Sequence, residues 1–146
     1  MSQTYLMIKP ELVADQRIGE VLKMLTDNKF RIRSLVMRQL DPRTVKAFYA
    51  EHEGKPFYEA LVAYISGGPV VAVRLEKENA VAELRALVGA TNPAEAAPGT
   101  IRRLYGRSLQ TNGVHASDSD ASAQRELAII FGPGDPGAAS QGLDNG

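Results

Sequence analysis

The segment GGPVVAVRLE at residues 67–76 decides the fold. Its first three residues favour a turn, and the run VVAVRLE that follows is apolar enough to be a strand in the middle of a sheet. A central strand needs partners on both sides. Three further runs supply them: TYLMI at 4–8, which stops before a Lys-Pro pair, the mostly alternating RIRSLVMRQL at 31–40, and a short run at 114–116.

Helices are predicted between these strands, where apolar residues recur at helical spacing. They cover 18–27, a stretch around 45–51 with Pro42 near its start, 56–65, a segment from the cap residue Asn79 to Val88 that stops at Gly89, and a last helix with Ala123, Leu127 and Ile130 on one face. Residues 89–111 lack periodicity and are expected to form a functional loop. This order predicts an α+β protein, a ferredoxin-like antiparallel sheet with helices packed on one face.

The composition describes one compact domain. The chain has 146 residues with 44% hydrophobic content, enough for a sizeable core over residues 1–131. Residues 132–146 are rich in glycine and proline, so this tail is expected to be poorly ordered or draped on a neighbour. The absence of cysteine excludes disulfides and thiolate metal sites and is compatible with the cytoplasm. We find no signal peptide and no apolar run near the ~18 residues of a membrane span.

The balanced charge restricts the classes of ligand and partner that the chain is expected to bind. The net charge is zero, so no global field steers the chain toward nucleic acid or membranes, and an anionic ligand needs a local cluster of cations. Lys9, Arg85 and Arg102 are candidates, although each alone is more often a solvated charge. The phosphate-binding motif GxxxxGK does not occur. Most of the aromatic residues at 49, 57 and 58 are expected to pack in the core, although one of them could stack on a base.

The segment NGVHASDS at residues 112–119 carries the chemistry. A lone histidine is usually a solvated or packing residue. His115, however, lies at a junction between a strand and a helix, and the amides at that helix start favour anions. Glu126, in the following helix, is placed to fix the tautomer of the imidazole. Together they indicate an activated nitrogen nucleophile, with His52 as the one other histidine of the chain.

Four segments carry a family resemblance: TYLMIKPE, FYAEHEGKPFYEALVAYISGGPVVA, VGATNPAEAAPGTIR and NGVHASDSDASAQRE. From residue 3 to about residue 131 the chain resembles the nucleoside diphosphate kinase family. The last segment is close to the family signature Asn-x-x-His-Gly/Ala-Ser-Asp, and the segments occur in the family's order.

The resemblance implies a ping-pong enzyme that moves the γ-phosphoryl group of a nucleoside triphosphate such as ATP to a nucleoside diphosphate such as GDP. His115 is then the nucleophile that becomes a phosphohistidine, with Glu126 orienting it and Ser117 and Tyr49 in support. The implied nucleotide contacts are Lys9, Arg85, Thr91, Arg102 and His52 at the phosphates, Lys9 and Asn112 at the ribose, and Phe57 and Leu109 on either face of the base.

The resemblance also implies a cofactor and an assembly. Mg²⁺ is expected to bridge phosphate oxygens without a dedicated carboxylate cage. A homo-oligomer, tetramer or hexamer, is expected, with residues 89–111 as an interface element. Two stretches depart from the family pattern: Glu11-Leu12 stands where Asp-Gly is usual, and Arg103-Leu104-Tyr105 where an acidic and an aromatic residue are common.

Two alternatives remain open. A non-catalytic nucleotide-binding regulatory module of the same fold is expected to lose residues such as His115, Lys9 or Arg102, which are present here. A nucleic-acid-binding protein needs exposed aromatic residues on a basic sheet face, which the strands at 4–8 and 70–76 do not offer.

Overall fold

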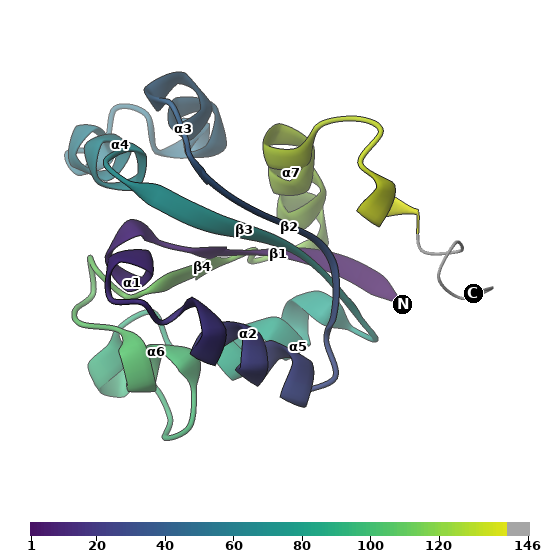
Figure 1. Ribbon diagram of the computed structural model, residues 1–146. Coiled ribbons are helices and arrows are strands. Elements are labelled where there is room, and N and C mark those ends of the chain that lie inside the picture. Colours follow the sequence, from purple (N-terminus) through teal and green to yellow (C-terminus); the bar gives the residue numbers. More distant parts are fainter. Residues whose placement is uncertain (140–146) are drawn as a thin grey trace.

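A four-stranded antiparallel sheet forms the middle of the molecule (Figure 1), and the computed structural model describes residues 1–139. The strands are β1 (Ser2–Ile8), β2 (Arg31–Gln39), β3 (Pro69–Lys77) and β4 (Val114–Ala116), in the order β2-β3-β1-β4. This arrangement confirms the α+β, ferredoxin-like prediction and the central place of 70–76. Within the described residues, no helix has both the length and the apolar character needed to cross a bilayer.

Helices cover both faces of the sheet, which corrects the prediction that they pack on one. One face carries α1 (Pro10–Ala14), α2 (Ile18–Asp27), α5 (Ala80–Val88) and α6 (Ile101–Tyr105), and the other carries α3 (Pro42–Phe48), α4 (Tyr58–Ser66) and α7 (Asp120–Phe131) (Figure 1). The reason lies in the continuous apolar runs of β1 and β3. Successive side chains of a strand point to opposite faces, so an unbroken apolar run needs a cover on each.

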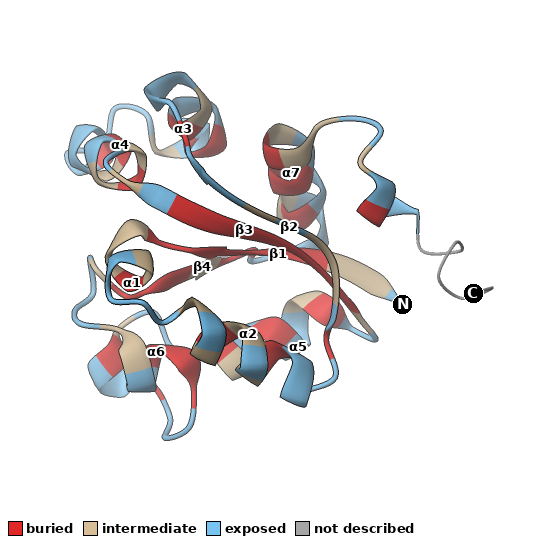
Figure 2. Cartoon of the chain, in the orientation of Figure 1, coloured by how far each residue is buried: buried red, intermediate tan, exposed pale blue. Residues whose placement is uncertain are grey.

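Each face has its own apolar core. In β1, Leu6 and Ile8 pack toward α2 and α5, whereas Tyr5 and Met7 pack toward α3, α4 and α7. All four of these side chains are fully buried, as the red strands of Figure 2 show. The second core reaches His115, because β4 pairs His115 with Met7 and so turns the imidazole toward the same face.

The helix boundaries follow local chemistry. Asp41 caps α3 by accepting a 2.7 Å hydrogen bond from the amide of Thr44, and Pro42 is the first helical residue, as predicted. The predicted stretch at 45–51 divides into α3 and a 3₁₀ turn at Ala50–His52. Asn79 precedes α5 in a left-handed conformation and makes no side-chain cap, unlike the prediction, while Gly89 ends the helix at a φ of 90°.

Two short helices were not predicted from the sequence. α1 follows directly on β1, and α6 lies inside the predicted loop 89–111, capped by the side chain of Thr100. Each has five residues, too few for apolar residues to repeat at helical spacing.

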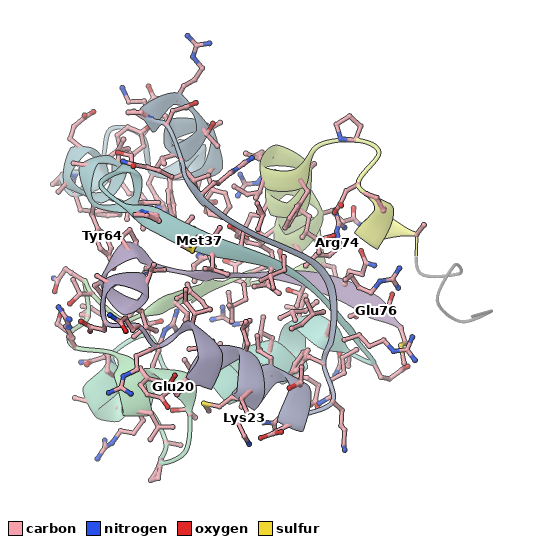
Figure 3. The ribbon with its side chains drawn as sticks, in the orientation of Figure 1. Glu20, Lys23, Met37, Tyr64, Arg74 and Glu76 are labelled. Atoms are coloured by element: carbon pink, nitrogen blue, oxygen red, sulfur yellow. The ribbon has the colours of Figure 1, made fainter. Side chains whose placement is uncertain are left out.

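The first part of the C-terminal tail lies against the sheet of its own chain, which differs from the expectation for 132–146. Asp135 forms a 2.8 Å ion pair with Arg74 of β3 and accepts a 2.7 Å hydrogen bond from Ser34 of β2. The carbonyl of Gly137 accepts a 3.0 Å bond from Gln3 of β1. Figure 3 shows Arg74 at this end of the sheet. Residues 140–146 lie outside the described residues.

The Asp135–Arg74 pair predicts a pH-dependent contribution to stability. Burial would raise the pKa of Asp135, but bonds from Ser34 and Arg74 outweigh it and hold the pKa below its ordinary value. We expect Asp135→Ala to lower the free energy of unfolding by about 3 kcal/mol at neutral pH, because the mostly buried Arg74 loses its counter-ion.

Urea denaturation across pH measures this effect. A lowered folded-state pKa stabilises the protein above the ordinary carboxyl pKa, and this contribution is lost as pH falls through the folded-state value. The difference between wild type and variant should therefore shrink in acid. The matched control is Asp27→Ala, which removes an exposed pair with Lys23 and should cost below about 1 kcal/mol. Equal losses for both variants would contradict the prediction.

Candidate active site

A polar pocket of about 260 Å³ lies where β4 meets α7. Its lining comes from α3 and the turn after it, α5, the long loop, α6, β4 and α7, and comprises Phe48, Tyr49, Glu51, His52, Arg85, Thr91, Arg102, His115, Ala116, Asp118 and Glu126. Seven of these were predicted as site residues. A larger hollow of about 570 Å³ lies beside Arg74, but its lining contains no histidine and only one cation, so we place the site in the smaller pocket.

His115 is held in the pocket by short-range backbone structure. Gly113 precedes the strand at a φ of 91°, a conformation that glycine adopts without strain, and its carbonyl accepts a 2.9 Å bond from the amide of Lys9. β4 then pairs with β1, and the imidazole ring meets the edge of Phe48 with ring centroids 5.1 Å apart. The ring is thus fixed on one side by apolar contact and open to the pocket on the other.

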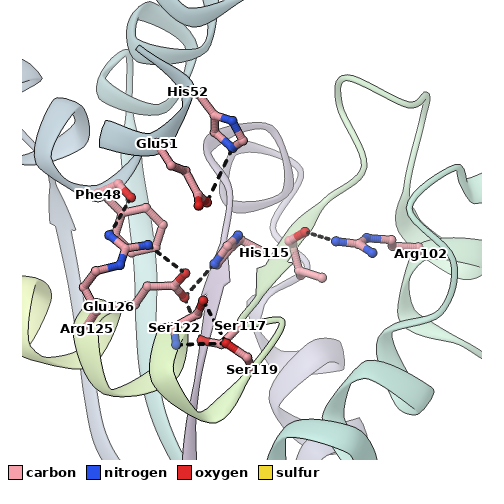
Figure 4. Close-up of polar contacts among 11 residues, drawn as sticks. Phe48, Glu51, His52, Arg102, His115, Ser117, Ser119, Ser122, Arg125 and Glu126 are labelled. Atoms are coloured by element: carbon pink, nitrogen blue, oxygen red, sulfur yellow. Dashed lines mark hydrogen bonds and ion pairs between the residues drawn. The ribbon is translucent and has the colours of Figure 1, made fainter.

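Glu126 orients the imidazole. Its Oε1 lies 2.8 Å from His115 Nε2 and also accepts a 2.6 Å bond from the hydroxyl of Ser117 (Figure 4). A carboxylate accepts, so this contact places the ring proton on Nε2 and leaves the lone pair on Nδ1. Glu126 is 5% exposed, and Arg125 lies 3.8 Å from its second oxygen. An imidazole with one nitrogen anchored and the other free is suited to nucleophilic attack.

Two of the predicted cations are buried: Arg102 lines the pocket, and Lys9 lies outside the lining but close enough for the charge of Arg102 to act on it. Arg102 donates to the carbonyls of Gly89 (3.1 Å) and Val114 (3.0 Å), and its Nε has no hydrogen-bond partner among the described residues. Burial, followed by the charge of Arg85, lowers the pKa of Arg102 to about 10. Lys9 is 8% exposed and donates a 2.8 Å bond to Asn112. Holding several cations together in a buried place costs free energy unless an anion joins them, which favours phosphate binding.

Aromatic side chains extend from the nucleophile to the rim. The buried Tyr49 stacks on His52 with centroids 6.1 Å apart, and His52 contacts Phe57 at 5.4 Å. Burial, and secondarily the charge of Glu126, raises the pKa of Tyr49, so its hydroxyl stays a neutral donor. Phe57 is 49% exposed, which leaves a face of its ring for a ligand.

The structure therefore brings together most of the predicted site. Asn112 links Lys9 to the loop by donating a 3.1 Å bond to the carbonyl of Thr91. Ser117, Phe57 and Asn112 lie outside the lining but contact Glu126, His52 and Thr91 in it, and Lys9 joins them through Asn112. Leu109 is half exposed and also outside the lining, so the structure does not bring it to the site.

Four lining residues were not singled out from the sequence: Phe48, Glu51, Ala116 and Asp118. Asp118 belongs to the segment NGVHASDS and could have been included on that ground. A hydrogen bond from Ser122 is the main cause that lowers its pKa, and Arg85 adds to it. Phe48 and Glu51 carry no comparable sequence signal, since each sits among ordinary helical residues.

Replacing Glu126 with glutamine should slow the phosphoryl transfer that the family resemblance implies, roughly 10- to 100-fold. A hydrogen bond to a charged group contributes about 1.5–3 kcal/mol, and each 1.4 kcal/mol is a factor of ten in rate. The fall should appear in the single-turnover rate with ATP. The matched control is Gln124→Ala, an exposed position on α7, which should keep the wild-type rate. An unchanged rate for Glu126→Gln would show that this carboxylate does not support the imidazole.

Comparisons with known proteins agree with this geometry. The family model described as nucleoside diphosphate kinase matches residues 2–135. A nucleoside diphosphate kinase of Pelotomaculum thermopropionicum is 47% identical over 131 residues, 90% of this chain and 88% of that protein.

Solved structures give the same result. That of the Aquifex aeolicus nucleoside diphosphate kinase superposes with a TM-score of 0.90 at 36% identity, over 92% of this chain and 98% of that one. A halophilic nucleoside diphosphate kinase from Halobacterium salinarum, solved in complex with CDP, gives a TM-score of 0.88 at 36% identity, over 92% and 90% of the two chains. With a matched family model, close relatives and the same fold, the chain belongs to the nucleoside diphosphate kinase family, a family of phosphotransferases.

Proposed function

We propose that this enzyme transfers the γ-phosphoryl group of a nucleoside triphosphate to a nucleoside diphosphate by a ping-pong mechanism, with His115 carrying the phosphoryl group between substrates. The observation that carries the proposal is the 2.8 Å contact between His115 Nε2 and Glu126, inside a pocket that Arg85 and Arg102 also line. An oriented imidazole supplies the nucleophile, and the cations supply the charge stabilisation that phosphoryl transfer needs.

In the first half-reaction, Nδ1 of His115 attacks the γ-phosphorus in line with the leaving diphosphate. The N–P bond forms, the bond between the γ-phosphorus and the bridging oxygen breaks, and the electron pair of that bond leaves on the β-phosphate. The proton on Nε2 stays on the ring, in its hydrogen bond to Glu126, and the carboxylate stabilises the positive charge that develops on the ring. The second half-reaction is the reverse, with an oxygen of another nucleoside diphosphate attacking the phosphohistidine.

The remaining pocket residues bind the nucleotide. Arg102 and Arg85 line the pocket and are placed to contact phosphate oxygens. We assign Thr91 and His52 to the phosphates, Lys9 to phosphate and ribose, Asn112 to the ribose, Phe57 to stacking on the base, and Tyr49 and Ser117 to support of the reacting groups. Leu109 is kept as the second contact to the base, a role that needs a shift of its loop when nucleotide binds.

Stacking would also explain a broad substrate range, because every base presents a π-face to Phe57. ATP, GDP and other nucleoside di- and triphosphates are the substrates we propose.

We propose Mg²⁺ as the cofactor, held mainly by the substrate. No group of three or more histidine, cysteine, aspartate or glutamate residues able to hold a metal occurs in residues 1–139. The carboxylates of Glu51 and Asp118 line the pocket near the phosphate-binding cations and fit a hydrated ion bound through phosphate oxygens. When bound, Mg²⁺ neutralises phosphate charge and helps align the reacting oxygens.

We also propose that the chain forms a homo-oligomer, a tetramer or hexamer. β2 is an edge strand whose Leu35 and Met37 are 49% and 56% exposed, and Leu104 of the long loop is 55% exposed (Figure 3 shows Met37). Exposed apolar side chains on a free strand edge favour association. Light scattering should give four or six times the 15.8 kDa of one chain, and the monomer mass would contradict this. We also propose that residues 1–131 form the catalytic unit, that 132–146 form an appended tail, and that the protein is cytoplasmic.

Steady-state kinetics test the proposed function. The rate is measured with ATP varied at several fixed concentrations of a nucleoside diphosphate such as GDP. A ping-pong enzyme gives parallel double-reciprocal lines, because the first product leaves before the second substrate binds. Intersecting lines would indicate direct transfer between two bound nucleotides. Nucleotide binding without any transfer would favour the regulatory module instead.

A further inference from the structure

The surroundings of Lys9 disfavour the positive charge of its side chain. It follows the last residue of β1 and is almost fully buried. Burial, and then the charge of Arg102, lowers the pKa of Lys9 to about 8, while Glu11 acts in the opposite direction. The role proposed for Lys9 at the phosphates requires the ammonium form, so the residues that preserve this form matter for turnover.

Glu11 is placed by α1 and fixed by a tyrosine from another element. α1 starts at Pro10, directly after Lys9, and Glu11 lies in its first turn, close enough for its charge to act on the lysine. The hydroxyl of Tyr64, near the end of α4, donates to the Glu11 carboxylate through a short hydrogen bond. Figure 3 shows Tyr64 where α4 meets α1.

The same tyrosine also faces the lysine. Lys9 Nζ lies 5.9 Å from the centroid of the Tyr64 ring, within reach of a cation–π interaction. Lys9 Nζ also donates a 2.8 Å hydrogen bond to the amide oxygen of Asn112. The ammonium is therefore set between an aromatic face and an amide, with one carboxylate and one guanidinium nearby.

We propose that Glu11, anchored by Tyr64, is a positioning residue for Lys9: the pair keeps the lysine side chain in place beside Asn112 and in its cationic form next to Arg102. The inference rests on the proposed phosphate-binding role of Lys9. Glu11 itself is separated from the lining of the reaction pocket and belongs instead to an apolar groove between α1 and α4, with Pro10, Val13 and Tyr64 in its wall.

The charges around Lys9 set the direction of the expected pH effect. Arg102 of α6 repels the ammonium, and Glu11 of α1 attracts it. Tyr64 of α4 is neutral, because burial and the bond to Glu11 raise its pKa, and Asn112 carries no charge. Arg107 acts on Tyr64 in the opposite direction. Removing the charge of Glu11 thus leaves repulsion and burial unopposed, and Lys9 loses its proton at a lower pH.

The test is the pH profile of phosphoenzyme formation, measured by rapid quench at Mg·ATP concentrations well below saturation, where the profile reports the groups of the free enzyme. The wild-type rate should fall as pH rises through about 8, where Lys9 deprotonates. For Glu11→Gln the fall should come about one pH unit lower, which makes the variant about fivefold slower at pH 8. Below about pH 6, where Lys9 is mostly protonated in both proteins, the two rates should converge. Superimposed profiles, or a loss that is equal at every pH, would overturn the proposal.

Two variants separate charge from packing. Glu11→Asp keeps the carboxylate and should restore a profile close to that of wild type. Tyr64→Phe removes the anchor and should shift the profile in the same direction as Glu11→Gln, by less. Glu78→Gln is the matched control, because Glu78 is exposed at the opposite end of β1, beside the N-terminal amine, and should leave the profile unchanged.

A second measurement needs no turnover. Limited acetylation with acetic anhydride across pH, read by mass spectrometry, reports the fraction of neutral amine at Lys9, with the exposed Lys46 as an internal reference. Acetylation of Lys9 should begin at lower pH in Glu11→Gln than in wild type, and identical curves would overturn the proposal. If wild type forms no phosphoenzyme at all, the proposed function fails, and this labelling still decides whether Glu11 controls Lys9.

Discussion

Replacement of His115 with alanine is expected to reduce phosphoryl transfer by a factor on the order of 10⁴ or more, which is the scale on which removal of a covalent nucleophile acts. The half-buried imidazole contacts Phe48, Tyr49 and Tyr5, but alanine is well tolerated in a strand of three residues, so the fold should persist. Nucleotide binding should persist too, since Arg85 and Arg102 remain. The measurement is the exchange rate between ATP and GDP, with nucleotide affinity measured in parallel.

The matched control is the other histidine. His52 lies at the rim, stacked on Tyr49, with no contact to Glu126. His52→Ala should weaken nucleotide binding modestly but retain a phosphorylated form of the protein. If His52→Ala abolished transfer and His115→Ala did not, the nucleophile would have been assigned to the wrong imidazole.

Arg102→Met is expected to lower kcat/KM roughly 10²- to 10³-fold, the loss seen when one donor to a transition-state charge is removed. It should also destabilise the protein. The carbonyls of Gly89 and Val114 would lose their donor, at a cost of about 1–3 kcal/mol for unsatisfied groups. Both effects follow from one side chain, because the guanidinium of Arg102 joins the end of α5 to β4 and also lines the pocket.

Kinetics and thermal unfolding of Arg103→Met provide the control for this prediction. Arg103 is the neighbouring residue of α6 and is exposed, and its side chain donates to the carbonyl of Ala94. Its replacement should change kcat/KM by little. A normal kcat/KM for Arg102→Met, despite lowered stability, would reduce Arg102 to a structural role.

Much of the fold could be predicted because its determinants are local in sequence. The unbroken apolar run at 70–76 predicts a central strand wherever the rest of the chain lies, and the breaks at Pro10 and Gly89 mark element ends through backbone chemistry alone. The distribution of helices over two faces was predicted incorrectly. Each helix reveals from sequence which of its sides is apolar, but not which face of the sheet it will cover. That choice depends on the connections and on the alternation of Tyr5 to Ile8 between two cores.

The candidate site likewise has a part that the sequence predicts and a part that it does not. His115, Ser117 and the start of α7 are close in sequence, so a short motif indicates their arrangement. Lys9, Arg85 and Arg102 come from three distant segments, and their joint use followed from family resemblance rather than from spacing. The contacts of Arg102 with Gly89 and Val114, and the pairing of Glu11 with Tyr64, arise only when separate elements pack together. No pattern within a single segment of the sequence indicates such contacts.

The most direct measurement is a label transfer. The protein is mixed with γ-labelled ATP and Mg²⁺, quenched in alkali, and mapped by mass spectrometry, while a duplicate receives excess GDP before the quench. We predict a phosphoryl group on His115 that is stable in alkali and labile in acid, that leaves as GTP when GDP is added, and that His115→Ala never acquires. Nucleotide binding with no label, or a label on any other residue, would contradict the mechanism proposed for His115 and its Glu126 partner.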